Sequence, residues 1–207
     1  MGQDTIVGDY YEGLEDAAGN KYYNSYSNAL SIYNSENVRI ENIAVQNSAG
    51  GITIMANNTT VENVTIEGSL FDNGISVSGN NLNKNTSGAI INNCKVNNCK
   101  DLGISFGGIK NGIIQNCYIT NCGNDNLTQD GTLNPNFGVN SSFNTGGGIS
   151  IENALNGDLG DNRVLILNTK IYNCYNYGIG IDHYGSAVDI IGCEINNITN
   201  TWKQDYD

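Results

Sequence analysis

The segment IINNCKVN at residues 90–97 is one of six similar segments in this chain. In each one an apolar residue stands two positions before a central Asn or Gly, and apolar or small residues stand one and three positions after it. The set is VRIENIAV (38–45), TVENVTIE (60–67), IINNCKVN (90–97), IIQNCYIT (113–120), LILNTKIY (165–172) and DIIGCEIN (189–196). A straight strand keeps its inward residues at alternate positions, so this change of phase predicts a corner at the central residue. Asn and Gly suit such a corner because they enter the left-handed backbone region at least cost.

A second recurring element is a Gly or its neighbour followed by an apolar-x-apolar triplet, as in GITIM at residues 51–55. The predicted inward pairs are Leu30/Ile32, Ile52/Ile54, Ile75/Val77, Ile104/Phe106, Ile149/Ile151 and Ile179/Ile181. Each repeat therefore has three short strands separated by corners. Strands that recur once per turn and stack on their equivalents predict a parallel β-solenoid with right-handed crossovers.

This pattern resembles the right-handed parallel β-helix family, the pectate-lyase-like superfamily, including its asparagine ladder at the second corner. The resemblance covers residues 27–201 and implies an all-β, single-stranded parallel β-helix of about six coils. Residues 1–26 do not match the repeat and are expected to form an N-terminal cap, and residues 202–207 a C-terminal tail. The superfamily includes lyases, hydrolases, epimerases, phage tailspikes and adhesins, so the fold does not fix the chemistry.

Composition and charge narrow the classes of partner. The 207 residues include 37 Asn and 26 Gly but one Pro, and the net charge is −12. A chain this acidic lacks the basic face that nucleic acids and anionic membranes require, and no run of 18 apolar residues predicts membrane insertion. Met1 to Gly13 also lacks the basic start of a signal peptide, which leaves a phage protein made in a cytoplasm or a piece of a secreted parent. An extracellular, cell-surface or virion location is expected, with a neutral or cation-bridged partner.

Three long insertions are predicted to border the face that carries the first strand of each repeat. They are residues 78–87, 123–147 and 153–162. Long loops on a rigid scaffold are where function usually lies. The first-strand face is therefore the predicted polysaccharide-binding surface.

Glu152 and Asp182 are the sharpest candidates for catalysis. The residue after each inward pair forms an outward row, and its last two members are these carboxylates, predicted to stack about 4.8 Å apart. His183, the single histidine, follows directly. Paired carboxylates beside an imidazole suit acid–base cleavage, elimination or epimerisation of a glycan. The alternative is that these residues are ordinary solvated surface residues. The lack of an Arg or Lys base on this row favours that alternative.

Three further groups were assigned from the sequence. Tyr172, Tyr175, Tyr177 and Tyr184 cluster near the fifth and sixth repeats, where exposed rings are candidates for carbohydrate stacking; surface tyrosines with no ligand are the alternative. Asp158 and Asp161 are candidate Ca²⁺ ligands, although no complete calcium loop surrounds them. The six cysteines divide into two inward rows, Cys94/Cys117/Cys193 and Cys99/Cys122/Cys174, which are expected to fill the core as buried thiols.

Three functions remain open on this sequence. The first is a carbohydrate-directed surface or virion protein, similar to tailspikes or adhesins, that binds polysaccharide. The second is a polysaccharide-modifying enzyme, a lyase, hydrolase or epimerase, that uses Glu152, Asp182 and His183. The third is an architectural filament or sheath subunit, since the short tail after residue 201 favours a homo-oligomer or a longer parent chain.

Overall fold

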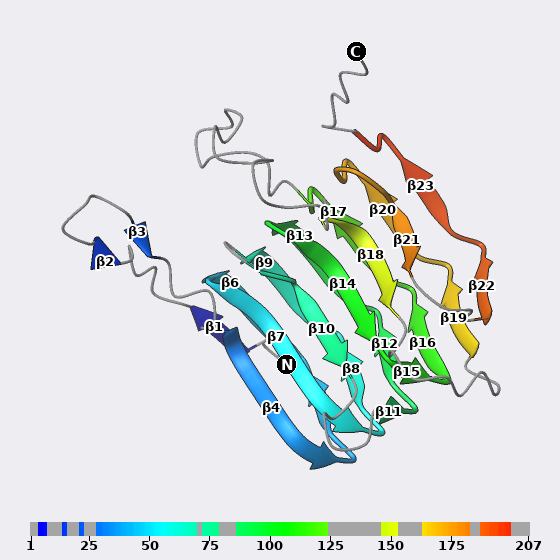
Figure 1. The fold of residues 1–207 in the computed structure, drawn as a ribbon, viewed down its shortest axis with the longest axis horizontal. Helices are drawn as coiled ribbons and strands as arrows, with labels where there is room; N and C mark the ends of the chain where they lie inside the picture. Colours follow the sequence, from blue (N-terminus) through cyan, green and yellow to red (C-terminus); the bar gives the residue numbers. More distant parts are fainter. Residues whose placement is uncertain are drawn as a thin grey trace.

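The computed structural model describes residues 28–69, 72–78, 88–123, 146–152, 163–182 and 187–199, with the strand backbones at 4–7, 14–15, 21–22 and 86–87. Within these residues every regular element is a β-strand, and the strands stack in parallel layers along one axis (Figure 1). The predicted right-handed parallel β-helix is confirmed.

The first sheet contains the strands that open each repeat. Its order is β4 (Asn28–Glu36), β7 (Gly50–Asn57), β10 (Ile75–Ser78), β14 (Leu102–Gly107), β18 (Gly147–Glu152) and β21 (Ile179–Asp182). All neighbouring pairs are parallel, and Ile52, Ile75, Ile104 and Ile149 align in one register. The predicted inward pairs thus stack on one another from strand to strand.

The second sheet follows the first corner of each repeat. It contains β5 (Arg39–Glu41), β8 (Thr60–Glu62), β12 (Ile90–Asn92), β16 (Gly112–Gln115), β19 (Arg163–Leu167) and β22 (Ala187–Ile191).

The third sheet follows the second corner. It contains β1 (Asp4–Val7), β6 (Ile43–Ser48), β9 (Thr65–Ser69), β13 (Lys95–Cys99), β17 (Tyr118–Thr120), β20 (Lys170–Tyr172) and β23 (Glu194–Asn196). Strand β1 belongs to the predicted cap, and its backbone extends this sheet by pairing with β6.

Two small sheets add to these three. β2 (Leu14–Glu15) pairs with β3 (Lys21–Tyr22) antiparallel, and β11 (Thr86–Ser87) pairs with β15 (Ile109–Lys110) parallel.

The predicted corner lies between the second and third sheets. Its six residues all have positive φ: Asn42 (58°), Asn63 (54°), Asn93 (52°), Asn116 (55°), Asn168 (47°) and Gly192 (66°). The phase slip seen in the sequence is therefore a left-handed residue that redirects the strand.

Two further rows of left-handed residues were not predicted. One row lies between the first and second sheets, at Asn37, Asn58, Gly88 and Asn111, and the other ends the third strand, at Asn47, Gly68, Asn98, Asn121, Asn173 and Asn197. Every described non-glycine residue with positive φ is an asparagine. The three corner rows together hold 13 of the 37 asparagines, whereas the predicted corner alone holds five.

Asparagine side chains link successive repeats at these corners. At the second corner the Asn63 amide donates to the Asn42 carbonyl oxygen at 3.3 Å, and Asn93 donates to Asn63 at 2.7 Å. At the other corners Asn58 donates to Asn37 at 3.2 Å and Asn197 donates to Asn173 at 2.6 Å. The predicted ladder is confirmed, and each link satisfies amide groups that a bare corner would leave to water.

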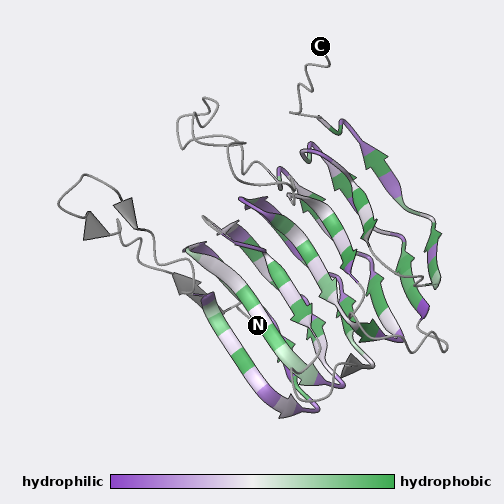
Figure 2. Ribbon diagram, in the orientation of Figure 1, coloured by the Kyte–Doolittle hydropathy of each residue, from purple (hydrophilic) through white to green (hydrophobic). Residues whose placement is uncertain are grey.

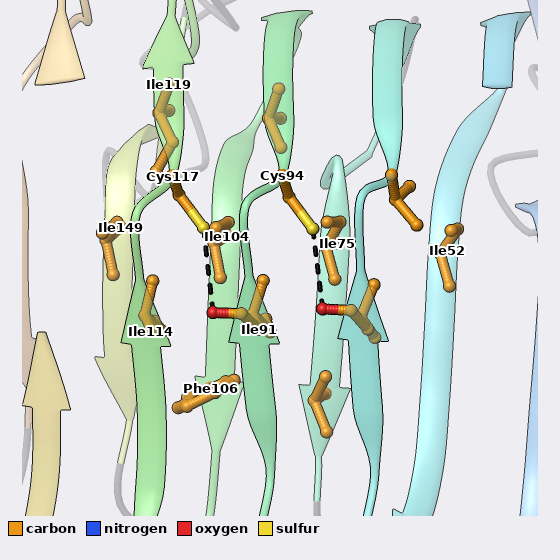
Figure 3. Close-up of a cluster of buried hydrophobic side chains, with 14 of the residues drawn as sticks. Ile52, Ile75, Ile91, Cys94, Ile104, Phe106, Ile114, Cys117, Ile119 and Ile149 are labelled. Carbon is orange, nitrogen blue, oxygen red and sulfur yellow. Dashed lines mark hydrogen bonds between the residues drawn. The ribbon is translucent and has the colours of Figure 1, made fainter. Parts of the chain in front are cut away.

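A narrow aliphatic core fills the solenoid. Strands alternate apolar and polar residues along their length (Figure 2), and Ile52, Ile75, Ile104 and Phe106 are fully buried between the sheets (Figure 3). Because each inward residue packs on its equivalents above and below, the same residue type recurs down each row.

The cysteine rows lie inside the core as predicted. Cys94, Cys99, Cys117, Cys122 and Cys174 are buried free thiols, whereas Cys193 is half-buried. The Cys94 and Cys117 sulfurs point toward the Val61 and Ile91 carbonyl oxygens, at 3.6 and 3.8 Å (Figure 3). Burial raises the pKa of the Cys122 thiol well above its ordinary value, so this sulfur stays protonated as a small apolar filler.

The inward residues of the last strands are exposed. Ile181, Ile190 and Ile195 are 53%, 45% and 44% exposed, whereas their equivalents one repeat earlier, Ile151, Ile166 and Ile171, are at most 2% exposed. Strands β21, β22 and β23 are also the last members of their sheets. Within the described residues, this end of the solenoid is apolar and its strand edges are unpaired.

Candidate carbohydrate-binding face

The outward row of the first sheet follows the predicted register. It consists of Tyr33, Met55, Ser78, Gly107, Glu152 and Asp182, each paired with the next across neighbouring strands. The members from Tyr33 to Glu152 occupy outward positions because the residue before each of them points into the core. The row brings aromatic, thioether, hydroxyl and carboxylate groups onto one line of the surface.

Glu152 and Asp182 end this row on adjacent strands. Their Cα positions are paired in register between β18 and β21. Glu152 is exposed, and its Oε1 accepts a hydrogen bond from the Ser150 hydroxyl at 3.2 Å. The backbone thus brings the two positions together, while the side-chain geometry of Asp182 lies outside the described residues.

Several predicted site residues also lie outside the described part of the chain. They are His183, Tyr184, Asp158 and Asp161, together with most of the three predicted insertions. Their assignments to catalysis, sugar stacking and calcium binding stay predictions. Within the described residues, no group of three or more His, Cys, Asp or Glu side chains is arranged to hold a metal.

Tyr175 and Tyr177 lie at the third corner of the fifth repeat. The Tyr175 backbone forms an isolated bridge to Thr199, and its amide donates to the Cys122 carbonyl oxygen at 2.9 Å. The Tyr177 ring packs against Gly147 and Gly180, where a Cβ on Gly180 would come within 2.7 Å of the ring. These glycines make room for the ring, and one of its faces is consequently occupied by protein.

The middle of the first-sheet face is buried. Ser105 and Ser150 lie between inward residues on β14 and β18 and so point outward, yet they are only 6% and 4% exposed. Leu102, which lies outside the main core cluster, is 3% exposed. On β18 the accessible outward residue is thus Glu152, whereas on β4 both Ser31 and Tyr33 are exposed.

The third sheet carries two outward tyrosines: Tyr118, which was not predicted as a site, and the half-buried Tyr172, which is one of the predicted sugar-stacking candidates. Tyr118 on β17 is 44% exposed, and its ring centroid lies 5.6 Å from that of Tyr172 on β20. The repeat alignment places both at outward positions of the third strand, but in different rows, so the alignment alone does not predict their contact.

Comparison with protein families supports the fold. Residues 71–202 match the family model described as "Right handed beta helix region". The comparison with curated proteins gives no match. No helix among the described residues is long and apolar enough to span a membrane.

Among solved structures, the chain is similar to the tailspike protein gp49 of Acinetobacter baumannii bacteriophage Fri1, a capsular polysaccharide depolymerase. The two are 13% identical with a TM-score of 0.50, and the match covers 98% of this chain and 43% of the tailspike. This chain therefore spans less than half the length of that protein, and the similarity concerns the fold.

Proposed function

Because this chain belongs to the right-handed β-helix family, we propose that it is a carbohydrate-directed protein that binds polysaccharide at a virion or cell surface. The observation that carries the proposal is a structural match, covering 98% of the chain, to a tailspike described as a capsular polysaccharide depolymerase. The net charge of −12 agrees with it, since neutral or cation-bridged glycans tolerate an acidic protein better than nucleic acids do.

The outward row of the first sheet is the proposed glycan contact. In the middle of the row the inward neighbours Ile52, Ile75 and Ile104 are fully buried, which holds the strands beneath it in place. A row that runs across successive strands suits an extended polymer better than it suits a small molecule, which usually occupies a concave pocket.

Binding to immobilised polysaccharides, measured together with product formation, tests the proposal. We expect the full chain to bind at least one capsular or cell-wall polysaccharide on an array, with affinity that depends on glycan type. Absence of binding to every glycan on a broad bacterial array would contradict it.

A second candidate function is polysaccharide modification. The pairing of Glu152 with Asp182 in register favours it, because their backbones lie about one strand spacing (about 4.8 Å) apart and two carboxyl groups can supply an acid and a base. Release of oligosaccharide products by the wild-type chain, lost in Glu152→Gln and Asp182→Asn without loss of binding, would establish this function. Equal product release by all three proteins would remove both residues from it.

A third candidate is an architectural subunit. The exposure of Ile181, Ile190 and Ile195 favours it, together with the lack of a pairing strand beyond β21, β22 and β23 among the described residues, because open edges and apolar surface promote association. Light scattering should then show assembly that rises with concentration and disappears in Ile190→Lys. A monomer at all concentrations would exclude self-assembly through this end.

A further inference from the structure

The outer face of the third sheet carries an aromatic pair that the core does not use. Tyr118 and Tyr172 project from β17 and β20, with ring planes tilted by 50° and centroids 5.6 Å apart. Their inward neighbours Ile119 and Ile171 are fully buried, so the strands beneath the rings are fixed by packing. Large rings on an outer face leave apolar surface in water, which is where ligand binding gains most.

Polar groups surround the rings in register. Lys95, Tyr118, Lys170 and Glu194 occupy equivalent positions on four neighbouring strands, about 4.8 Å apart. The Tyr172 hydroxyl is hydrogen-bonded to Glu194, which raises the pKa of Tyr172 to about 12 and lowers the pKa of Glu194. Lys170 lies 3.5 Å from the same carboxylate. The Tyr172 ring is therefore held in place by its hydrogen bond to Glu194.

A second row beside the rings is ordered by side-chain hydrogen bonds. The Asn97 amide donates to Glu67 at 2.7 Å, and the Thr120 hydroxyl donates to Asn97, also at 2.7 Å. These bonds fix donors and acceptors next to the aromatic surface before any ligand arrives, which lowers the entropy cost of binding.

The charges around the rings balance. Lys95 and Lys170 stand against Glu67 and Glu194, although the chain as a whole carries −12. Lys95 is exposed and makes no ion pair with a described residue, so its ammonium is free to donate to a ligand. A neutral surface selects no charged ligand, whereas the combination of an apolar ring and flanking donors and acceptors matches a sugar, which has an apolar C–H face and a rim of hydroxyls.

We propose that Tyr118 and Tyr172 form a platform on which uncharged pyranose rings of a polysaccharide stack, with Lys95 and Glu194 bonding to their hydroxyls. This inference rests on the proposed function and adds a contact on a different sheet from the outward row of the first sheet. A peptide is a poorer fit, because the platform lies on paired strands in the middle of a sheet and offers no free edge for strand addition.

Titration of neutral and uronic-acid oligosaccharides tests the platform. The probes are the neutral array glycan bound best by the wild-type chain and an oligogalacturonate of similar length. Tyr118→Ala and Tyr172→Ala should each weaken binding of the neutral probe about tenfold or more, and Tyr118→Phe should retain it. Arg163→Ala removes an exposed side chain from the second sheet and serves as the control, with no expected change.

The possible results separate the two proposals. Wild-type binding that is unchanged in both tyrosine variants would overturn the platform and leave polysaccharide binding intact. Wild-type protein that binds no probe would overturn the proposed function and the platform with it. Tighter binding of the oligogalacturonate, or affinity that falls steeply as salt rises, would overturn the assignment of an uncharged ligand. Thermal unfolding of each variant separates loss of contact from loss of fold.

Discussion

The inward and outward sides of the third sheet differ in how they change from strand to strand. The inward row is aliphatic throughout: Val45, Ile66, Val96, Ile119, Ile171 and Ile195. The outward row next to it reads Ala44, Thr65, Lys95, Tyr118, Lys170 and Glu194. Packing against equivalent neighbours restricts the first row to one kind of side chain. Residues of the second row do not pack in the core, so their side chains can vary from strand to strand and can contact a ligand.

The largest effect should come from the inward side. Phe106 is fully buried in the first sheet, and Phe106→Ala is expected to lower the free energy of unfolding by about 3–5 kcal/mol through lost burial and a cavity. Urea denaturation measures it. Tyr118→Ala, on the outward side, is the matched control. An equal loss of unfolding free energy in this variant would contradict the difference between the two sides.

Corner residues should come next. Asn93 has φ of 52° and donates to Asn63, so Asn93→Ala should cost about 2–3 kcal/mol from left-handed strain and a lost hydrogen bond. Asn93→Gly keeps the backbone conformation accessible and should cost less. The same urea experiment compares the two variants. Equal stability of the wild type and the Ala variant would show that the left-handed backbone at this corner does not require Asn.

Buried thiols should make stability fall at alkaline pH. Burial raises the pKa of Cys122, so the folded chain holds this proton while the unfolded chain releases it above its ordinary pKa of about 8.5. Stability contributed by the protonated thiol is complete below that pH and declines above it by about 1.4 kcal/mol per pH unit. Urea midpoints at pH 7 to 10 measure the slope, and Cys122→Ala should flatten it. Parallel slopes for the two proteins would contradict the expectation.

The smallest effect on stability should come from the outward carboxylate. Glu152 is exposed and accepts one hydrogen bond, from Ser150, so Glu152→Gln should change the free energy of unfolding by less than about 0.5 kcal/mol. Any loss of product release in this variant would then report on chemistry and not on folding. A loss of several kcal/mol would mean that the outward row supports the fold.

The interior was largely predictable from the sequence because it repeats. The phase slip at Asn93 and its equivalents predicted the second corner, and the Ile52/Ile54 type of pair predicted the first sheet. The left-handed residues of the other two corners were missed although their signal was present: Asn37, Asn58, Gly88 and Asn111 lie five residues before the aligned position, and Asn47, Gly68, Asn98, Asn121, Asn173 and Asn197 lie five residues after it. In a chain with so many asparagines, regularly spaced Asn residues are easily mistaken for chance occurrences.

The candidate site was less predictable because outward residues do not repeat. Register brought Glu152 and Asp182 into adjacent positions as expected. Burial of Ser105 and Ser150 could not be foreseen, since alternation predicts which way a side chain points and not what covers it. The contact between Tyr118 and Tyr172 joins diagonal positions on strands separated by an insertion, which a row-by-row alignment does not compare.

Paired measurement of glycan affinity and unfolding free energy for the Tyr118→Ala/Tyr172→Ala double variant tests the central claim most directly. The claim is that the outward side of the solenoid carries polysaccharide binding while the inward side carries stability. We predict that the double variant loses most of its affinity for a neutral oligosaccharide and keeps its free energy of unfolding within about 1 kcal/mol of the wild type. Unchanged affinity, or binding that is lost only together with the fold, would contradict the claim.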